Sequence, residues 1–217
     1  MAKTARLVML VSGRGSNLQA FIDATKSDAL EAEICAVISN RADAYGLQRA
    51  ANAGIPTEIV NHRQFDSREA FDAELLACVQ HYRADLVLLA GFMRILTPVF
   101  VSPLQGHLLN IHPSLLPKYP GLDTHQRALD AGDSEHGVTV HFVTQQLDSG
   151  APIIQARVPV LPNDDATTLA KRVLEQEHLI YPLAANWFIT GRLRLRGSQA
   201  LLDDQSLPAT GYIFSAN

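Results

Sequence analysis

The feature that most constrains the fold is an alternation of apolar runs with amphipathic stretches through the first half of the chain. The runs Leu7–Val11, Ile34–Ser39 and Asp85–Ala90 are apolar nearly throughout, without a polar residue at every second position. Strands of this kind are buried on both faces, as in a parallel sheet covered by helices. The pattern therefore predicts an α/β fold with an open, mostly parallel Rossmann-like sheet and helices on both faces. We expect further strands at Thr57–Val60 and Leu108–Ile111, and helices at Leu18–Thr25, Ala44–Ala53 (ending at Gly54) and Ser67–Tyr82.

The second half has a different pattern. Val138–Val143 and Pro152–Val160 alternate between apolar and polar residues, and the turn Asp148–Gly150 lies between them. This predicts an antiparallel extension of the sheet. Ala166–Ile189 reads as a long helix, kinked or interrupted at Pro182. Beyond Gly197 we expect a weak strand and a loose tail. The sequence contains no linker or repeat, so it predicts a single domain over residues 1–217.

Composition narrows the possible partners. The 217 residues include 18 Lys and Arg against 22 Asp and Glu, and the basic residues form no cluster. Nucleic acid and membrane surfaces are therefore not expected as partners, whereas a small phosphorylated ligand needs only local donors. The two cysteines, Cys35 and Cys78, belong to no CxxC pair, which favours free thiols in a reducing compartment. With no apolar leader or membrane-spanning run, we expect a cytoplasmic protein.

Ligands of open α/β sheets bind beyond the carboxyl ends of the strands. Three segments occupy such places: Gly13–Asn17 after the first strand, Gly91–Arg94 after the strand ending at Ala90, and the end of the strand Leu108–Ile111. We expect these three segments to converge on one cleft.

Gly13–Asn17 reads Gly-Arg-Gly-Ser-Asn before a helix. Glycines let the backbone approach an anion, and the helix directs its first N–H groups toward that anion, so a phosphate monoester is a fitting ligand. The segment lacks the Gly-Lys-Ser/Thr of a Walker loop and the third glycine of a dinucleotide fingerprint. The alternative is an ordinary tight turn with Ser16 or Asn17 as the helix N-cap.

Asn110 and His112 lie two apart in a strand and so project from the same face. A carboxamide and an imidazole can both donate to a developing oxyanion, and an imidazole can also move a proton. Asp148 could hold His112 in its cationic form. The alternative is that Asn110, His112 and Asp148 only shape turns. The sequence also leaves open whether His141 lines the cleft or faces solvent. The eight histidines show no metal-ligand spacing, so we predict no metal site.

Four segments in order resemble the phosphoribosylglycinamide formyltransferases, a formyltransferase family that uses 10-formyltetrahydrofolate, and the resemblance runs from about Arg6 to about Leu195. They are Ser-Gly-Arg-Gly-Ser-Asn-Leu-Gln (Ser12–Gln19), Leu-Ala-Gly-Phe-Met-Arg-Ile-Leu (Leu89–Leu96), Leu-Asn-Ile-His-Pro-Ser-Leu-Leu-Pro (Leu109–Pro117), and Gly-Val-Thr-Val-His-Phe-Val (Gly137–Val143) with Leu-Asp-Ser-Gly (Leu147–Gly150).

The resemblance implies transfer of a formyl group from 10-formyltetrahydrofolate to the amine of glycinamide ribonucleotide in purine biosynthesis. The small-molecule partners would be these two substrates, and the chain would act as a monomer or homodimer. It also implies a cis peptide at Leu116–Pro117. The implied site residues are Asn110, His112 and Asp148 for catalysis, Gly15, Ser16, Asn17 and Glu177 for the substrate's phosphate and ribose, and Met93, Arg94, Leu96, Val143 and Asp148 for the folate.

Two positions depart from the family pattern. Asp123 stands where bacterial members often have histidine, which leaves that position without a catalytic assignment. Leu174 replaces a polar residue one helical turn before Glu177, so no phosphate contact is expected there.

Alternative functions are formyltetrahydrofolate hydrolase, methionyl-tRNA formyltransferase, and a non-catalytic sugar-phosphate-binding module. The two enzymes carry further domains for which this chain shows no segment, and the binding module would have no use for Asn110, His112 and Asp148 together.

Overall fold

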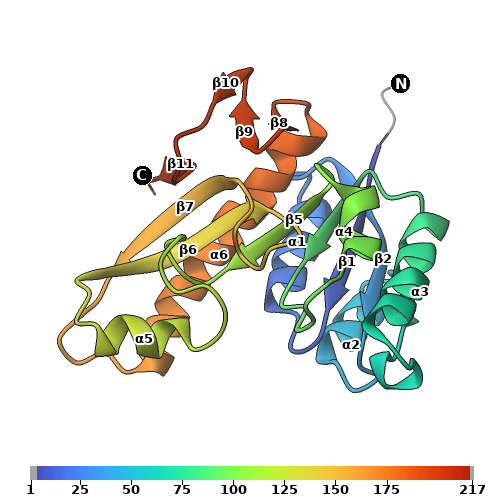
Figure 1. Ribbon diagram of the computed structural model, residues 1–217, viewed down its shortest axis with the longest axis horizontal. Helices are drawn as coiled ribbons and strands as arrows, with labels where there is room; N and C mark the ends of the chain where they lie inside the picture. The colour runs from blue at the N-terminus through green and yellow to red at the C-terminus, as the bar shows by residue number, and fades with distance from the viewer. Residues whose placement is uncertain (1–3, 216–217) are drawn as a thin grey trace. The chain divides into compact units, whose positions relative to one another are not determined.

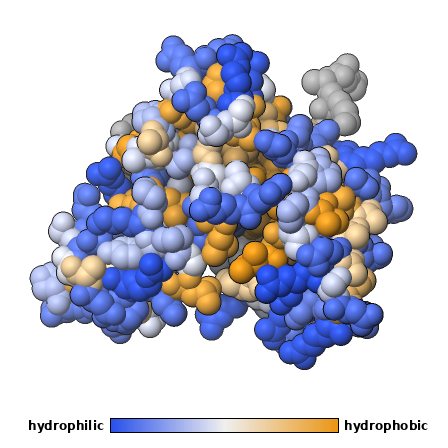
Figure 2. Space-filling view, viewed as in Figure 1, coloured by the Kyte–Doolittle hydropathy of each residue, from blue (hydrophilic) through white to orange (hydrophobic). Residues whose placement is uncertain are grey.

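The computed structural model describes residues 4–215. The contacts among them form two compact units, which divide between Leu109 and Asn110. That the whole of 1–217 is a single domain stays a prediction. In the described part of the chain, no helix is both long enough and apolar enough to cross a membrane. Hydrophilic and hydrophobic residues are interspersed over the face shown in Figure 2.

The first unit is built on a parallel sheet in which the strands follow the order β4-β1-β2-β3 (Figure 1). Leu7 of β1 pairs with Ile34 of β2 and with Leu86 of β4, so β1 lies between two parallel neighbours. The apolar runs are buried as predicted, because neighbouring strands and helices cover both faces. The elements are β1 (Ala5–Val11), α1 (Ser16–Lys26), β2 (Ala32–Ser39), α2 (Tyr45–Asn52), β3 (Thr57–Ile59), the 3-10 helix η1 (His62–Gln64), α3 (Arg68–His81), β4 (Leu86–Leu89), α4 (Pro98–Val101) and the 3-10 helix η2 (Ser102–Leu104).

Capping residues set the ends of the helices in this unit. The side chain of Ser67 accepts a hydrogen bond from the backbone N–H of Ala70, which begins α3. After α2, the chain turns at Gly54, whose φ of 74° favours glycine. In Figure 1, α1 and α3 flank β1 and β2 on opposite sides. These observations confirm the predicted mostly parallel sheet with helices on both faces.

The second unit contains an antiparallel pair, as predicted. Its strands follow the order β5-β6-β7-β11, in which β6 and β7 are antiparallel and β7 and β11 are parallel. The boundary between the units falls within β5. The elements are β5 (Leu108–His112), α5 (Thr124–Asp130), β6 (Glu135–Phe142), β7 (Pro152–Pro159), α6 (Ala166–Ile189), β8 (Leu193–Arg196), β9 (Gln199–Leu202), β10 (Gln205–Ser206) and β11 (Tyr212–Phe214).

The long helix α6 covers β6 and β7. Asp165 caps its first turn: its side chain accepts from the N–H of Thr168 at 2.7 Å, and the Thr168 hydroxyl accepts from the N–H of Asp165 at 2.9 Å. The helix continues through Pro182 without an interruption. Of the two predicted effects of this proline, interruption is therefore wrong.

The end of the chain is more regular than we predicted. Strands β8, β9 and β10 form a small antiparallel sheet, and β11 adds to the edge of β7. The expectation of one weak strand and a loose tail is wrong for the described residues, because short strands are stabilised by pairing with other strands, and the pattern of a single short segment does not show this contact. The same reason explains why β8, and the short helix α5 beside α6, were not predicted.

Candidate active site

The three predicted catalytic residues come together in the second unit. Asn110 and His112 lie on β5, and Asp148 lies in the turn after β6. The side chains of His112 and Asp148 are only 7% and 6% exposed, and His112 Nδ1 lies 3.4 Å from Asp148 Oδ2. A buried carboxylate is costly unless it has hydrogen-bond partners, so this pairing stabilises both groups. The predicted contact between His112 and Asp148 is confirmed.

His112 has an acceptor at each ring nitrogen. Nε2 lies 2.9 Å from the carbonyl oxygen of Tyr119, and Nδ1 faces the carboxylate of Asp148. A carbonyl and a carboxylate can only accept, so a ring with a proton on each nitrogen satisfies both contacts. That His112 is cationic stays a prediction.

Asp148 also fixes the loop that follows β5. Its Oδ2 accepts a hydrogen bond from the N–H of Gly121 at 2.8 Å. Asp148 itself has a φ of 48°, a left-handed conformation that is uncommon for a residue with a side chain. The carboxylate therefore ties together the turn after β6, the loop at Gly121 and the ring of His112.

His141 is a member of this site that sequence reasoning left undecided. It is 2% exposed, its Nδ1 lies 2.8 Å from the carbonyl oxygen of Phe142, and its Nε2 lies 3.2 Å from the amide nitrogen of Asn110. Burial lowers the pKa of His141 to about 4. A neutral ring with its proton on Nδ1 donates to Phe142 and accepts from Asn110. His141 thus orients the Asn110 carboxamide.

The alternation of Val138–Val143 suggested that one face of this strand is exposed, which left His141 without a clear place. In the structure, residues 136–142 are all buried. Helix α6 contacts β6, and the loop after β5 also lies against this strand, because the N–H of Leu116 donates to Thr139 Oγ1 at 3.0 Å. The predicted cis peptide at Leu116–Pro117 lies in this loop and is confirmed.

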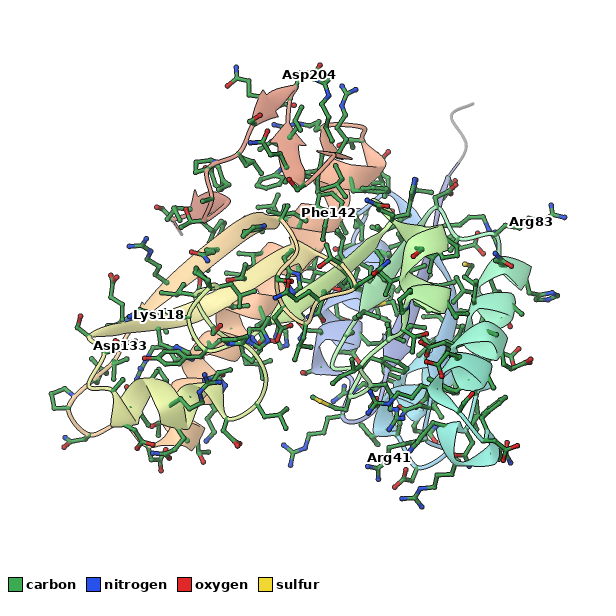
Figure 3. All side chains as sticks on the ribbon, viewed as in Figure 1. Arg41, Arg83, Lys118, Asp133, Phe142 and Asp204 are labelled. Atoms are coloured by element: carbon green, nitrogen blue, oxygen red, sulfur yellow. The ribbon has the colours of Figure 1, made fainter. Side chains whose placement is uncertain are left out.

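Two further histidines lie beside His112. His125 Nδ1 and His136 Nε2 are 3.1 Å apart, and His136 is 1% exposed. Burial, and then the charge of His125, lower the pKa of His136 to about 4. Burial, and then the charge of His112, lower the pKa of His125. Nearby, Lys118 and Asp133 form an ion pair at 3.0 Å, whose two ends lie side by side in Figure 3.

The histidine pair His125 and His136 should make the fold sensitive to acid. In the unfolded chain His136 binds a proton near its ordinary pKa of 6.5, whereas in the folded chain it binds one only near pH 4. The unfolded state then holds more protons, so we expect the free energy of unfolding to fall by about 1–3 kcal/mol as the pH drops from about 6.5 to 4. Urea unfolding at several pH values measures this loss.

His136→Gln is the test variant and His81→Gln, at an exposed position on α3, is the control. We expect a flatter pH dependence of the urea midpoint in His136→Gln, and an unchanged one in His81→Gln. Equal slopes in His136→Gln and the unmodified protein would contradict the assignment.

The glycine-rich segment lies in the first unit, between β1 and α1. Gly15 has a φ of 69° and is the N-cap of α1, and a Cβ there would lie 2.7 Å from Gly46 Cα. The N–H of Gly46 donates to the carbonyl of Gly13 at 2.9 Å. No side-chain hydrogen bond caps this helix, so the alternative with Ser16 or Asn17 as N-cap is wrong. The backbone of a close-packed turn therefore leads into the helix, as a phosphate loop requires.

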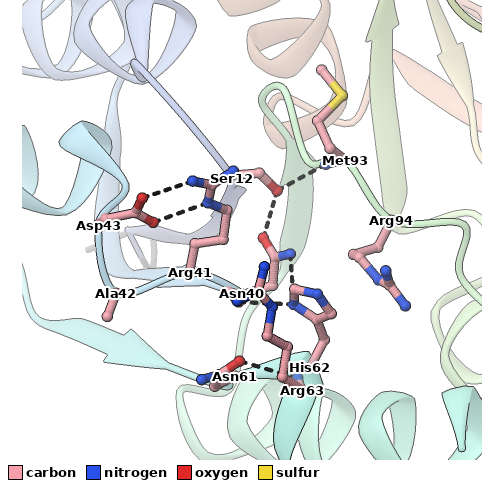
Figure 4. Close-up of a pocket in the computed structure, with 10 residues that line it drawn as sticks. All are labelled: Ser12, Asn40, Arg41, Ala42, Asp43, Asn61, His62, Arg63, Met93 and Arg94. Carbon is pink, nitrogen blue, oxygen red and sulfur yellow. Dashed lines mark hydrogen bonds and ion pairs between the residues drawn. The ribbon is translucent and has the colours of Figure 1, made fainter.

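The segment after β4 lies against the segment after β1. Ser12 Oγ accepts a hydrogen bond from the N–H of Met93 at 2.8 Å and donates to Asn40 Oδ1 at 2.5 Å. Met93 is 68% exposed, Arg94 is half-buried and Leu96 is 8% exposed. Figure 4 shows the pocket of about 440 Å³ that lies here, lined by Ser12, Asn40–Asp43, Asn61–Arg63, Met93 and Arg94.

Two of the three expected strand ends thus converge within the first unit. The binding roles of Gly15, Ser16, Asn17, Met93, Arg94 and Leu96 in this unit, and of Val143 and Glu177 in the second, stay predictions, as does their convergence with Asn110 and His112 on one cleft. Within residues 4–215, no three His, Cys, Asp or Glu side chains are grouped so that they could hold a metal ion.

Comparison with known proteins gives consistent matches. The model of the formyl transferase family matches residues 5–185. A phosphoribosylglycinamide formyltransferase of Escherichia coli is 56% identical over 206 residues, which span 95% of this chain and 97% of that protein. The solved structure of the Coxiella burnetii phosphoribosylglycinamide formyltransferase, in complex with CHES, matches with a TM-score of 0.94 and 51% identity, covering 98% of this chain and 100% of that one. The trifunctional purine biosynthetic protein adenosine-3 of Drosophila melanogaster is 50% identical over 188 residues, 86% of this chain and 14% of that protein.

Proposed function

The chain belongs to the formyl transferase family, and we propose that it transfers the formyl group of 10-formyltetrahydrofolate to the amine of glycinamide ribonucleotide. The observation that carries this proposal is the group of Asn110 with the buried side chains of His112 and Asp148, in a chain that matches phosphoribosylglycinamide formyltransferases over nearly its whole length. The product is N-formylglycinamide ribonucleotide, an intermediate of purine biosynthesis.

In the first step, the neutral amine of glycinamide ribonucleotide attacks the formyl carbon on N10 of the folate. A new C–N bond forms, and the carbonyl oxygen becomes an oxyanion. Asn110 is a donor to this oxygen, because its amide group has two N–H bonds and His141 engages one of them. His112 is the second donor, through Nε2. In the structure this nitrogen contacts the carbonyl of Tyr119, so the oxyanion has to take the place of that carbonyl.

In the second step, the bond between the formyl carbon and N10 breaks. The attacking amine loses a proton and N10 gains one, so protons balance over the reaction. Asp148 keeps His112 cationic and assists this proton movement, directly or through a water molecule. General acid–base assistance of this kind contributes about 10² to 10⁴ in rate. Holding both substrates side by side contributes the rest through proximity.

The binding residues follow from the family pattern and the local geometry. We propose that Gly15, Ser16 and Asn17 bind the phosphate of the ribonucleotide at the start of α1, and that Glu177 on α6 binds its ribose or glycinamide. Met93, Arg94 and Leu96 form one wall of the folate site, and Val143 to Asp148 encloses the pterin. We further propose that the protein acts in the cytoplasm as a monomer or homodimer, with no nucleic-acid partner and no metal.

The deciding experiment is a spectrophotometric assay with the purified protein and 10-formyl-5,8-dideazafolate or the natural donor, with and without glycinamide ribonucleotide. Deformylation that requires the ribonucleotide is the expected result. Deformylation without the ribonucleotide would identify a hydrolase. Binding of either ligand without any deformylation would favour the sugar-phosphate-binding module.

A further inference from the structure

A buried amide on β7 contacts the loop that follows β5. Gln155 is 1% exposed and lies opposite Thr139 of β6 in the antiparallel pair, so the two side chains share one face of the sheet. The side-chain nitrogen Nε2 of Gln155 donates to the carbonyl oxygen of Leu116 at 2.8 Å and to Thr139 Oγ1 at 3.1 Å. A carbonyl oxygen can only accept, so the amide nitrogen has to face Leu116, which fixes the orientation of the Gln155 side chain.

The Thr139 hydroxyl joins Gln155 to the same loop. It donates to the carbonyl oxygen of Ser114 at 2.6 Å and accepts from the N–H of Leu116 at 3.0 Å. A hydroxyl has one hydrogen to donate and two lone pairs, and all three are used once Gln155 is the third partner. Thr139 and Ser114 are fully buried, where a polar group that loses its partner is costly. Leu116 is therefore held at both its N–H and its carbonyl.

The anchored loop begins at His112. The N–H of Ser114 donates to the carbonyl oxygen of His112 at 2.8 Å, and the Ser114 hydroxyl donates to the carbonyl oxygen of Lys118 at 2.6 Å. In Figure 1 this loop, between β5 and α5, passes over β6, where Thr139 lies. The backbone from His112 to Lys118 thus forms a compact turn that lies against β6.

The residues that follow return to the site twice. The carbonyl oxygen of Tyr119 lies 2.9 Å from His112 Nε2, and the N–H of Gly121 donates to Asp148 Oδ2 at 2.8 Å. Both contacts are made by the backbone of the loop. Their positions therefore depend on how the loop is anchored.

Two sets of bonds hold the loop from different sides. On its more exposed side, Arg127 donates to the carbonyl oxygen of Pro120 at 2.6 Å, and Asp133 accepts from the hydroxyl of Tyr119 at 2.9 Å. On its buried side, the anchor is the amide of Gln155 with its threonine partner. Water competes for exposed hydrogen bonds, whereas a fully satisfied buried network makes its surroundings rigid, so the buried anchor restrains the loop more strongly.

We propose that Gln155 is a positioning residue for formyl transfer: it fixes the loop after β5 where the N–H of Gly121 holds the Asp148 carboxylate. That carboxylate faces His112 Nδ1 at 3.4 Å, so a displaced loop changes its direction toward the ring. Gln155 acts through the loop and not on the substrates. The proposal rests on the proposed function, in which Asp148 and His112 are catalytic.

Gln155→Met tests the proposal, because methionine has a similar length and volume but no N–H to donate. The Leu116 carbonyl and one lone pair of Thr139 then lose their partner, which frees the loop from its buried anchor. A misplacement of about 1 Å can cost about 100-fold in rate, so we expect kcat to fall by about 10- to 100-fold. The loop carries none of the residues proposed to bind the two substrates, so both KM values should stay within about twofold.

Ile154→Val is the control for a general loss of stability. Ile154 is fully buried next to Gln155 on β7, and its side chain points to the opposite face of the sheet. The smaller side chain lowers the thermal midpoint because less apolar surface is buried, yet kcat should stay within about twofold.

A double-mutant cycle tests the route through the carboxylate. In an Asp148→Ala background the loop has already lost its contact with that carboxylate. If Gln155 acts through this contact, Gln155→Met should lower kcat far less in the Asp148→Ala background than in the unmodified protein.

Four outcomes would overturn the proposal while the unmodified protein transfers formyl groups. They are an unchanged kcat in Gln155→Met, a rise in either KM with an unchanged kcat, an equal loss of kcat in Ile154→Val, and additive effects in the cycle. Absence of formyl transfer by the unmodified protein would instead refute the proposed function, and this inference with it.

If Gln155→Met does not fold, as judged by circular dichroism, Thr139→Val and Thr139→Ser take its place. Valine has the shape of threonine without the hydroxyl that links Gln155 to Ser114, whereas serine keeps that hydroxyl. We expect kcat to fall in Thr139→Val and to be retained in Thr139→Ser. Equal kcat values in these two variants would overturn the proposal.

Discussion

Asp148→Ala is expected to lower kcat by about 10²- to 10⁴-fold, the range of general acid–base assistance. Two effects combine in this loss. His112 loses the carboxylate that faces Nδ1 at 3.4 Å, so the cationic ring is no longer favoured. The N–H of Gly121 also loses its acceptor at 2.8 Å, which releases the loop that carries Tyr119. Steady-state kinetics with both substrates saturating measures the change.

A second variant separates these two effects. Asp148→Asn keeps an oxygen that can accept from Gly121 but removes the charge, so we expect it to retain the loop and still lose most of kcat. Ser149→Ala, in the same turn, removes an exposed hydroxyl that donates to the carbonyl of Gln146 and also contacts the Thr144 hydroxyl, and serves as the control with a kcat within about twofold. Turnover like that of the unmodified protein in Asp148→Ala would refute the role assigned to the carboxylate.

Asn110→Ala is expected to lower kcat by about 10²- to 10³-fold, the usual cost of removing one donor from an oxyanion site. The carboxamide is held by His141, whose neutral ring accepts its N–H at 3.2 Å, so the donor is already oriented before substrate arrives. Because the interaction strengthens only as the oxyanion forms, kcat and kcat/KM should fall together, with little change in either KM.

The fold should survive this substitution, because Asn110 is only partly buried and the described strand β5 keeps its backbone pairing. Circular dichroism and the thermal midpoint check this point. Asn52→Ala, at an exposed position at the end of α2, is the control and should keep its turnover. A selective rise in one KM with an unchanged kcat would show that Asn110 binds substrate and does not stabilise the oxyanion.

The strands and helices with strong periodic patterns could be predicted from the sequence. β1, β2 and β4 were evident because their apolar runs match only strands buried on both faces, and α3 and α6 because apolar residues recur at helical spacing within one element. Asn110 and His112 were placed together for the same local reason, since residues two apart in a strand share a face.

The candidate site could be predicted only where one element, or the family pattern, brought its residues together. The contact of His112 with Asp148 was anticipated, but the hydrogen bond from Asn110 to His141 was not, since it depends on how β5 and β6 lie beside each other. The small sheet β10-β9-β8 was missed because its strands are too short to show a period.

The sequence by itself determined the α/β class, the order of the main elements and the identity of the chemical groups at the strand ends. Only the tertiary structure decided that His141 is neutral and holds Asn110, that Asp148 also holds Gly121, and that Gln155 holds Leu116. The physical reason is range: periodicity and turn chemistry act over a few residues, whereas these contacts join groups more than 20 residues apart and arise only when packing buries polar atoms that then need partners.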